Sequence, residues 1–292
     1  MLSIIICSVS PERLRKLSAN IQETIGVKYE IIAINNQEKK WPIARAYNEG
    51  ARQASYPYLF FVHEDVIFHS YNWGKIIENK LAEPDCGLIG FAGSKAMMNS
   101  YGGWGQYDWR WISSFYFFKG ERAAVQLEAN NVKLCDNYDP VAVLDGFAFF
   151  VRHEVWKEFP FDEELLTGFH CYDIDFSLSV GSKYRNYVCG FQIWVEHLSA
   201  GSFNSEWIVD SVRLYNAKWK NILPVKTDDI CLTPKELYRN TEGIFYRFLF
   251  KALRTDVSRK VKWQILKDFW MLPFKWSHFT HCLSCTLKFI RC

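Results

Sequence analysis

The chain has 292 residues, of which 49% are hydrophobic and 17% aromatic, so it can bury a large core in one or two domains. A formal net charge of only +3 excludes a protein that binds polyanions over its whole surface. The charge is uneven, because residues 239–292 contain eleven Lys and Arg but three acids. The carboxyl-terminal tail is therefore basic and the remainder mildly acidic.

Apolar segments and cysteines indicate the cellular compartment. The amino-terminal apolar run, residues 2–7, is too short for the hydrophobic region of a signal peptide and follows no basic cluster. No segment reaches the roughly 18 apolar residues of a membrane span. The nine cysteines are scattered and odd in number, which is typical of reduced thiols. We expect a cytoplasmic protein, with peripheral attachment to the inner face of the membrane as an open alternative.

Strands and helices alternate in the first part of the chain. The apolar runs 2–7 and 29–35 are typical of strands buried on both faces, and 58–68 is a third such run. Helical spacing of apolar residues is found between them, at 11–25 and 42–55. This order predicts an α/β fold with a mostly parallel, Rossmann-like sheet flanked by helices.

The middle of the chain is less regular. Strand character returns at 86–93 and at 142–156, and a late strand is predicted within 187–203. Residues 100–111 are rich in Gly and Trp without periodicity, which predicts a long loop. A helix is expected within 167–184.

Polar residues end or interrupt the first three predicted strands. Ser8 and Ser10 follow the first strand, and Asn35 ends the second. The acid pair Glu64 and Asp65 interrupts the third between two apolar blocks. Ligands of open parallel sheets bind beyond the carboxyl ends of the strands. These residues therefore predict a ligand crevice with the acid pair at its floor.

Three polar clusters suggest the chemistry of that crevice: residues 63–65, 172–175 and 196–197. A carboxylate and an imidazole from separate strand ends can hold a divalent cation, with phosphate oxygens as further ligands. Another carboxylate nearby can accept a proton from a hydroxyl nucleophile. Together these groups predict transfer from a nucleotide diphosphate.

An ordered series of motifs carries a family resemblance over roughly residues 2–220. The segments are "PIARAYNEGARQASYPYLFFVHEDVIF" (42–68), "FDEELLTGFHCYDIDFSL" (161–178) and "VEHLSAGSF" (195–203). In order and spacing they resemble the inverting family 2 glycosyltransferases of the GT-A fold, and most of all the subgroup related to the streptomycin biosynthesis protein StrF.

The resemblance implies a hexosyltransferase-like enzyme of polysaccharide biosynthesis. Its donor would be a UDP- or GDP-linked sugar, and its acceptor a hydroxyl of a glycan or a lipid-linked glycan. A divalent cation, Mn²⁺ or Mg²⁺, would stabilise the departing diphosphate. We expect a nucleotide-sugar-binding catalytic domain at 1–224 and a basic, aromatic helical extension at 225–292.

The same resemblance implies roles for individual residues. Asp65 and His197 correspond to the metal ligands, and Asp173 to the base that deprotonates the acceptor. Asp175, two positions further along the expected helix, points elsewhere and has a capping or structural role. The expected nucleotide-binding residues are Ser8, Ser10, Asn35, Arg45, Asn48, His63 and Glu64. For Glu64 a supporting contact is the alternative, and for Arg45 a solvated side chain.

Three positions differ from the family motifs. The first acid of the metal motif is His63, which could bind the metal or the ribose. The glutamate of the Glu-Asp-x-Asp motif is Tyr172, and the aspartate that reads the base is Asn35. These departures keep a non-catalytic nucleotide-sugar-binding module open as an alternative.

Other enzymes on similar sheets fit less well. A sugar nucleotidyltransferase needs a glycine-rich phosphate loop after the first strand, and residues 7–14 contain no glycine. A dinucleotide-dependent oxidoreductase is excluded, because no G-x-G-x-x-G motif follows any strand.

The acceptor side is expected to include Asp145, Trp104 and His170. Asp145 lies in an apolar strand, where a lone carboxylate is costly to bury unless it is paired or lines a pocket. Trp104, with Trp109 and Trp111, could stack on sugar rings or pack on the body of the protein.

The tail interleaves aromatic and basic residues over 239–292, which is the composition of a helix at an anionic membrane surface. A helical subdomain or an oligomer interface is the alternative. We expect no nucleic-acid binding, because no recognition motif is present. Zinc binding by "HFTHCLSC" is not expected, because His278 and Cys285 would lie about 10 Å apart along a helix.

Overall fold

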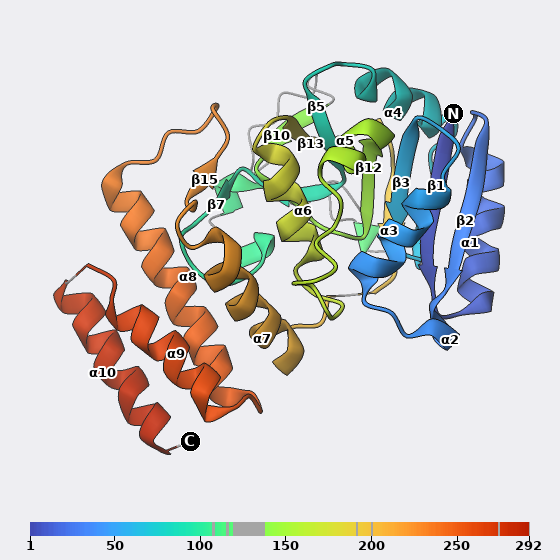
Figure 1. Ribbon diagram of the computed structural model, residues 1–292. Coiled ribbons are helices and arrows are strands. Elements are labelled where there is room, and N and C mark those ends of the chain that lie inside the picture. Colours follow the sequence, from blue (N-terminus) through green and yellow to red (C-terminus); the bar gives the residue numbers. More distant parts are fainter. Residues whose placement is uncertain are drawn as a thin grey trace.

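The computed structural model has a central seven-stranded sheet flanked by helices (Figure 1). It describes residues 1–106, 109–114, 117–118, 138–190, 192–199, 201–273 and 275–291. The sheet order is β10 (Tyr138–Val141), β13 (Arg185–Cys189), β5 (Cys86–Gly90), β12 (Ala148–Arg152), β3 (Tyr58–Val62), β1 (Leu2–Ser8) and β2 (Tyr29–Asn35). Only β10 and β12 run antiparallel to their neighbours in this sheet. The predicted α/β fold with a mostly parallel sheet is confirmed.

Helices cover both faces of this sheet. They are α1 (Pro11–Thr24), α2 (Asn36–Lys39), α3 (Ile43–Gln53), α4 (Trp73–Leu81), α5 (His153–Glu158) and α6 (Tyr172–Gly181). Helix α7 (Ser205–Leu214) packs outside α6 and continues as a π-helical turn at Tyr215–Trp219. Strand β1 is buried on both sides: Ile5 packs in a cluster with α3 and α6, while Ile4 and Ile6 pack with α1 and α4. Burial on both faces explains why the sequence of β1 is a continuous apolar run.

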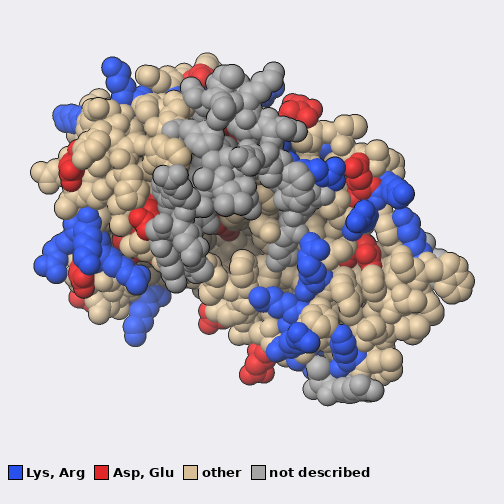
Figure 2. All heavy atoms as spheres, turned by 180° about the vertical axis from the view of Figure 1, so that it is seen from behind, with Lys and Arg blue, Asp and Glu red and all other residues tan. Residues whose placement is uncertain are grey.

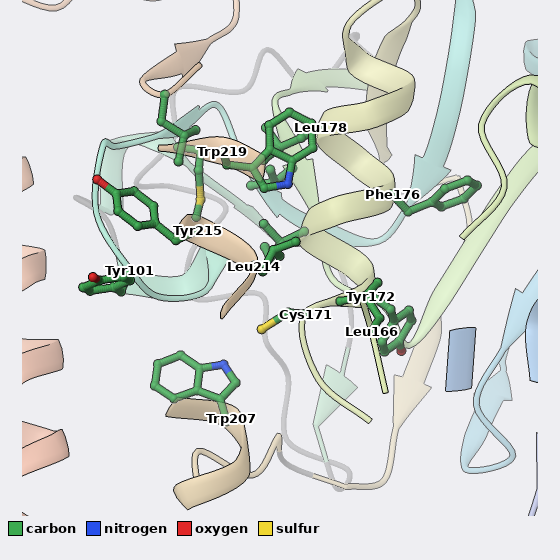
Figure 3. Packing of buried hydrophobic residues seen from close by; sticks show 14 of the residues in the cluster. Tyr101, Leu166, Cys171, Tyr172, Phe176, Leu178, Trp207, Leu214, Tyr215 and Trp219 are labelled. Carbon is green, nitrogen blue, oxygen red and sulfur yellow. The ribbon is translucent and has the colours of Figure 1, made fainter. Parts of the chain in front are cut away.

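Helix α6 lies between the sheet and the chain segment of α7. Tyr172 and Phe176 belong to its sheet side, and Leu178 lies near Trp219 (Figure 3). The ring of Phe176 packs against that of Phe161 in a tilted arrangement, with centroids 4.2 Å apart. Helix α6 is therefore packed on both sides by buried side chains.

The segment 58–68 is two strands in different sheets, so the prediction of one strand was wrong. Strand β3 ends at Val62, and β4 (Val66–Phe68) pairs with β14 (Val195–His197), which also pairs with β9 (Phe117–Phe118). The polar residues between β3 and β4 leave the plane of the central sheet, because a doubly buried strand cannot accommodate three of them. The predicted late strand divides in the same way into β13 and β14.

Short strands build two further sheets beside the central one. One contains β11 (Val143–Leu144), β6 (Ala92–Ser94) and β8 (Ile112–Ser114), and the other β15 (Val225–Lys226) and β7 (Ala96–Met97). The predicted strand 86–93 is therefore β5 followed by β6. The predicted loop 100–111 contains two short 3₁₀ turns, Trp104–Gln106 and Trp109–Trp111.

Three helices follow β15: α8 (Pro234–Arg254), α9 (Arg259–Trp270) and α10 (Trp276–Arg291). They pack on one another beside α7 (Figure 1). Thr233 and Glu236 form a reciprocal cap at the start of α8. Phe245 and Phe248 of α8 join the same hydrophobic cluster as the sheet, through Tyr101. None of the described helices is long and apolar enough to cross a membrane.

Helix α10 is continuous, so His278 and Cys285 lie two turns apart, as the sequence argument against zinc requires. His281 Nδ1 lies 2.7 Å from a carboxylate oxygen of Glu242, and His278 Nδ1 lies 3.6 Å from the same atom. These contacts join α10 to α8.

Candidate active site

Three potential metal ligands converge where β3 and β4 separate. His63 and Asp65 lie in the connection between these strands, and His197 ends β14. The pairing of β14 with β4 sets His197 opposite Val66, directly after Asp65. One ligand atom from each of the three side chains lies within 4.8 Å of the other two. His197 Nε2 is 3.4 Å from Asp65 Oδ1.

The environment fixes the charges of this group. Burial alone would raise the pKa of Asp65, but hydrogen bonds with His197 and Ser199 outweigh burial and hold that pKa well below its usual range. Burial and the nearby His197 lower the pKa of His63 to about 4. At neutral pH the group therefore presents a carboxylate and, at His63, a neutral imidazole, which is the form that binds metals.

Packing orients both imidazoles. The ring of His197 stacks on Phe147, with centroids 4.6 Å apart and planes at 14°. The hydroxyl of Tyr172 lies 2.7 Å from His63 Nε2. Two imidazoles with one carboxylate suit a divalent first-row transition metal better than Mg²⁺, which prefers oxygen ligands. These residues fit a divalent metal site.

Glu64 supports the loop after β1. Its Oε2 accepts hydrogen bonds from the Ser8 hydroxyl at 2.8 Å and from the backbone N–H groups of Val9 and Ser10, each at 3.1 Å. Its other oxygen is buried without a hydrogen-bond partner. Ser10 in turn caps α1 by accepting from the N–H of Arg13. Glu64 thus links the end of β1 to the segment between β3 and β4.

Asp173 lies in the first turn of α6, next to the residue that contacts His63. The chain enters this helix through Cys171 in a left-handed conformation, with φ of 64°. Burial and the nearby Asp145 raise the pKa of Asp173 to about 7, although it accepts backbone hydrogen bonds from Ile174 and Gly146. A carboxyl group with this pKa can accept a proton near neutral pH.

Asp145 is joined to Trp104. The indole N–H of Trp104 donates to Asp145 Oδ2 at 2.8 Å, and the N–H of Phe147 donates to Oδ1 at 3.1 Å. Burial raises the pKa of Asp145 above its usual value, against the effect of His197. The structure therefore brings two of the three predicted acceptor residues together, beside Asp173.

Comparison with known proteins gives the family. The profile described as "Glycosyltransferase like family" matches residues 3–217. The chain belongs to this family. No curated protein sequence gives a significant match.

Two solved structures resemble this glycosyltransferase-like chain. The mannosyltransferase PcManGT from Pyrobaculum calidifontis, in complex with GDP-Man and Mn²⁺, is 9% identical, with a TM-score of 0.52. The match covers 99% of this chain and 86% of that one. A197 from STIV is 13% identical, with 80% and 96% coverage and a TM-score of 0.40. The first of these supports a GT-A fold.

Other predicted nucleotide-binding residues lie at the same end of the sheet. Ser8 and Asn35 are directly opposite each other at the carboxyl ends of β1 and β2, and Asn35 is exposed. Arg45 is exposed on α3, and its guanidinium lies 4.5 Å from the ring centre of Trp41. Lys39 lies 4.1 Å from the centre of the same ring.

Asn48 is better explained by packing than by nucleotide binding. Its amide NH₂ donates to the Phe161 carbonyl and to Glu163, and its oxygen accepts from the Trp156 indole and the Phe161 N–H. All four hydrogen-bonding positions are used within the protein. We therefore leave Asn48 out of the proposed site.

Three other residues of the sequence analysis also have protein partners. Asp175 is buried, with Lys218 2.8 Å away and the Trp219 indole N–H donating to it at 2.9 Å, as a structural role requires. His170 interacts with Asn204 at the start of α7, and burial lowers its pKa. Trp111 is buried in the core. The side chain of Trp109 lies outside the described residues.

Three residues that contact the potential metal ligands were not identified as site residues from the sequence. Ser199 bonds Asp65, Phe147 supports His197, and Tyr172 contacts His63. Ser199 lies in the quoted "VEHLSAGSF" motif, and Tyr172 was noted only as a departure. Phe147 sits in an apolar run and gives no signal in the sequence.

Proposed function

We propose that the protein is a metal-dependent inverting glycosyltransferase that moves a sugar from a nucleotide diphosphate to a hydroxyl group. The observation that carries this proposal is the meeting of His63, Asp65 and His197 beyond the carboxyl end of β3. Ligands of such sheets bind at this end. The family membership and the GDP-Man and Mn²⁺ in the mannosyltransferase of similar fold support it.

Asp173 is the proposed base. With a pKa of about 7 it accepts the proton of the acceptor hydroxyl as the oxygen attacks the anomeric carbon. Asp145, held by Trp104, faces the acceptor and keeps that pKa high. A single displacement on the face opposite the leaving group inverts the configuration.

The donor side is built from the ends of β1 and β2. Ser8, Ser10 and Asn35 bind the base and ribose, and Glu64 fixes the loop that carries the two serines. A divalent cation held by Asp65, His197 and His63 would supply charge stabilisation to the diphosphate when bound. The two imidazoles favour a first-row transition metal, such as the Mn²⁺ of the mannosyltransferase complex, over Mg²⁺. We also assign the chain to the StrF-related subgroup on the motifs quoted above.

The direct test is hydrolysis or transfer of a panel of UDP- and GDP-sugars with and without Mn²⁺. We expect Mn²⁺-dependent release of nucleotide diphosphate, abolished by Asp65→Asn and reduced about 10²–10⁴-fold by Asp173→Asn. Asp228→Asn is the matched control, since its side chain is 98% exposed. Nucleotide-sugar binding without turnover with any acceptor would instead identify a binding module.

We place the reaction at an anionic membrane surface, with a lipid-linked glycan as acceptor and residues 225–292 as the attachment region. The outward side of α9 alternates lysine and tryptophan at helical spacing: Lys260, Trp263, Lys267 and Trp270 are all exposed. On the face shown in Figure 2, Lys and Arg gather over the carboxyl-terminal helices. Exposed tryptophan and lysine on one face are typical of helices at the bilayer interface.

Helix α10 extends this surface. The indole N–H of Trp270 donates to Thr286 at 3.1 Å, and the rings of Trp263 and Phe289 lie 5.7 Å apart. Beyond these contacts α10 exposes an apolar stripe and contains no acid. The stripe consists of Trp276, Leu283, Leu287 and Ile290. A second copy of the chain is a poorer occupant, because a two-fold pair would bring like charges of this basic surface together.

Vesicle sedimentation tests the attachment. We expect binding to vesicles containing phosphatidylglycerol, weaker binding to pure phosphatidylcholine, and loss of both in a Trp263→Ser, Trp270→Ser double variant. The control is Trp194→Ser, also exposed but on the catalytic body. Equal sedimentation of the double variant, or concentration-dependent dimerisation that the double variant abolishes, would refute the lipid assignment.

A further inference from the structure

Two residues that depart from the family motifs contact each other. Tyr172 stands where the motif has glutamate, and His63 stands where it has the first acid. They lie 109 positions apart in the chain, and Tyr172 Oη is 2.7 Å from His63 Nε2. Each departure alone could indicate loss of the site. Their direct contact indicates that one compensates for the other.

The hydrogen-bond partners determine which ring nitrogen of His63 carries the proton. Tyr172 Oη also lies 2.9 Å from the carbonyl oxygen of Gly146. A carbonyl oxygen can only accept, so the single hydroxyl proton of Tyr172 lies on that bond. The hydroxyl oxygen must then accept from His63, whose Nε2 carries the hydrogen. The lone pair of the imidazole is consequently on Nδ1.

The position of the Tyr172 hydroxyl is tightly fixed. Tyr172 is 4% exposed, and its ring meets Tyr47 edge-on with centroids 5.8 Å apart. A Cβ atom at Gly146 would collide with the Tyr172 hydroxyl and ring, so this approach requires glycine. The hydroxyl is therefore confined between Gly146 and His63.

Resting on the proposed metal-dependent transfer, we propose that Tyr172 orients His63 so that His63 Nδ1 is a ligand of the divalent ion, with Asp65 and His197. Metal-bound histidines commonly donate their other ring N–H to an oxygen partner, which fixes the tautomer and strengthens the ligand. Tyr172 is such a positioning residue. Ribose binding through His63 Nε2 is excluded, because that atom is already used.

Mn²⁺ binding, followed by electron paramagnetic resonance in the presence of UDP or GDP, tests the pair without an activity assay. Tyr172→Phe keeps the ring and removes only the hydroxyl, and should weaken Mn²⁺ binding about 10–100-fold. His63→Asp should retain Mn²⁺ binding while losing one of the two ¹⁴N couplings from coordinated imidazoles. In the His63→Asp background, Tyr172→Phe should have no further effect on affinity.

The outcomes separate this inference from the proposed function. No Mn²⁺ binding by the wild type with either nucleotide would defeat both. Binding that Asp65→Asn removes, but that Tyr172→Phe leaves unchanged, would overturn the role of Tyr172 alone. A ¹⁴N signal from one imidazole, unchanged in His63→Asp, would overturn ligation by His63. If Tyr172→Phe fails to fold, the comparison of ¹⁴N couplings between wild type and His63→Asp still decides whether His63 is a ligand of the ion.

Discussion

Replacing the proposed base should make the protein more stable while it inactivates it. The pKa of Asp173 is raised from 3.8 to about 7 by burial and by Asp145, so the folded protein holds its proton more tightly than the unfolded chain. The linked stability is fully present below about pH 4 and is lost as the pH rises to about 7. Asparagine removes the ionisation and with it this loss.

The size of the change in unfolding free energy follows from the pKa shift of Asp173. About three pKa units at roughly 1.4 kcal/mol each give up to about 4 kcal/mol between acidic and neutral pH. At about pH 5 the corresponding gain is about 1.5–2 kcal/mol, because the carboxyl is already ionised in the unfolded chain but still protonated in the folded protein, and only the interval from 3.8 to 5 contributes. The stabilisation of Asp173→Asn over wild type should therefore grow by about 2 kcal/mol from pH 5 to pH 8.

Urea unfolding at the two pH values, in EDTA, measures this difference. The exposed Asp228→Asn variant removes the same charge without the burial, and should show a gain near zero at both pH values. If Asp173→Asn destabilises the protein, or stabilises it equally at pH 5 and pH 8, the carboxyl group is not held at high pKa. The assignment of Asp173 as a base poised near neutrality would then be wrong.

Further predictions concern pH, the β1 loop and the packing of Tyr172. Below about pH 7, kcat/KM should rise tenfold per pH unit as the base deprotonates, then level off; a flat profile from pH 5 to 8 would contradict this. Glu64→Ala leaves three hydrogen-bond donors without their acceptor, so we expect the free energy of unfolding to fall by about 1–3 kcal/mol. Calorimetry should also show weaker binding of the nucleotide diphosphate, and an unchanged affinity would argue against a role of the β1 loop in binding. Gly146→Ala should lower the free energy of unfolding by about 1–3 kcal/mol, because the added methyl group collides with Tyr172. Gly105→Ala, which has open space around it, should leave that free energy nearly unchanged. Equal losses in the two variants would refute the steric argument.

The sheet was largely predictable from the sequence because its signal is local. Continuous apolar runs gave β1 and β2, and helical spacing gave α1 and α3. The polar ends of these strands also located the crevice, since parallel strands bring their carboxyl ends to one edge. Ser8 and Asn35 are directly opposite each other for this reason.

The features that were missed depend on pairing between distant segments. Val66–Phe68 has the same apolar character as β3, so nothing local shows that it pairs with β14 instead. Asn48 looks like a ligand residue on a helix, but its partners at 156–163 are invisible in a one-dimensional pattern. The role proposed for Tyr172 likewise becomes apparent only from its contact with His63.

The separation of β3 from β4 has a consequence for how the chain matures. Two prospective ligands, His63 and Asp65, emerge early during synthesis, but the third arrives only when β14 has docked on β4. Closing so long a loop is entropically slow compared with forming neighbouring helices. A nascent or truncated chain ending before β14 would contain every strand of the central sheet yet would lack His197, so it could not bring the three prospective ligands together.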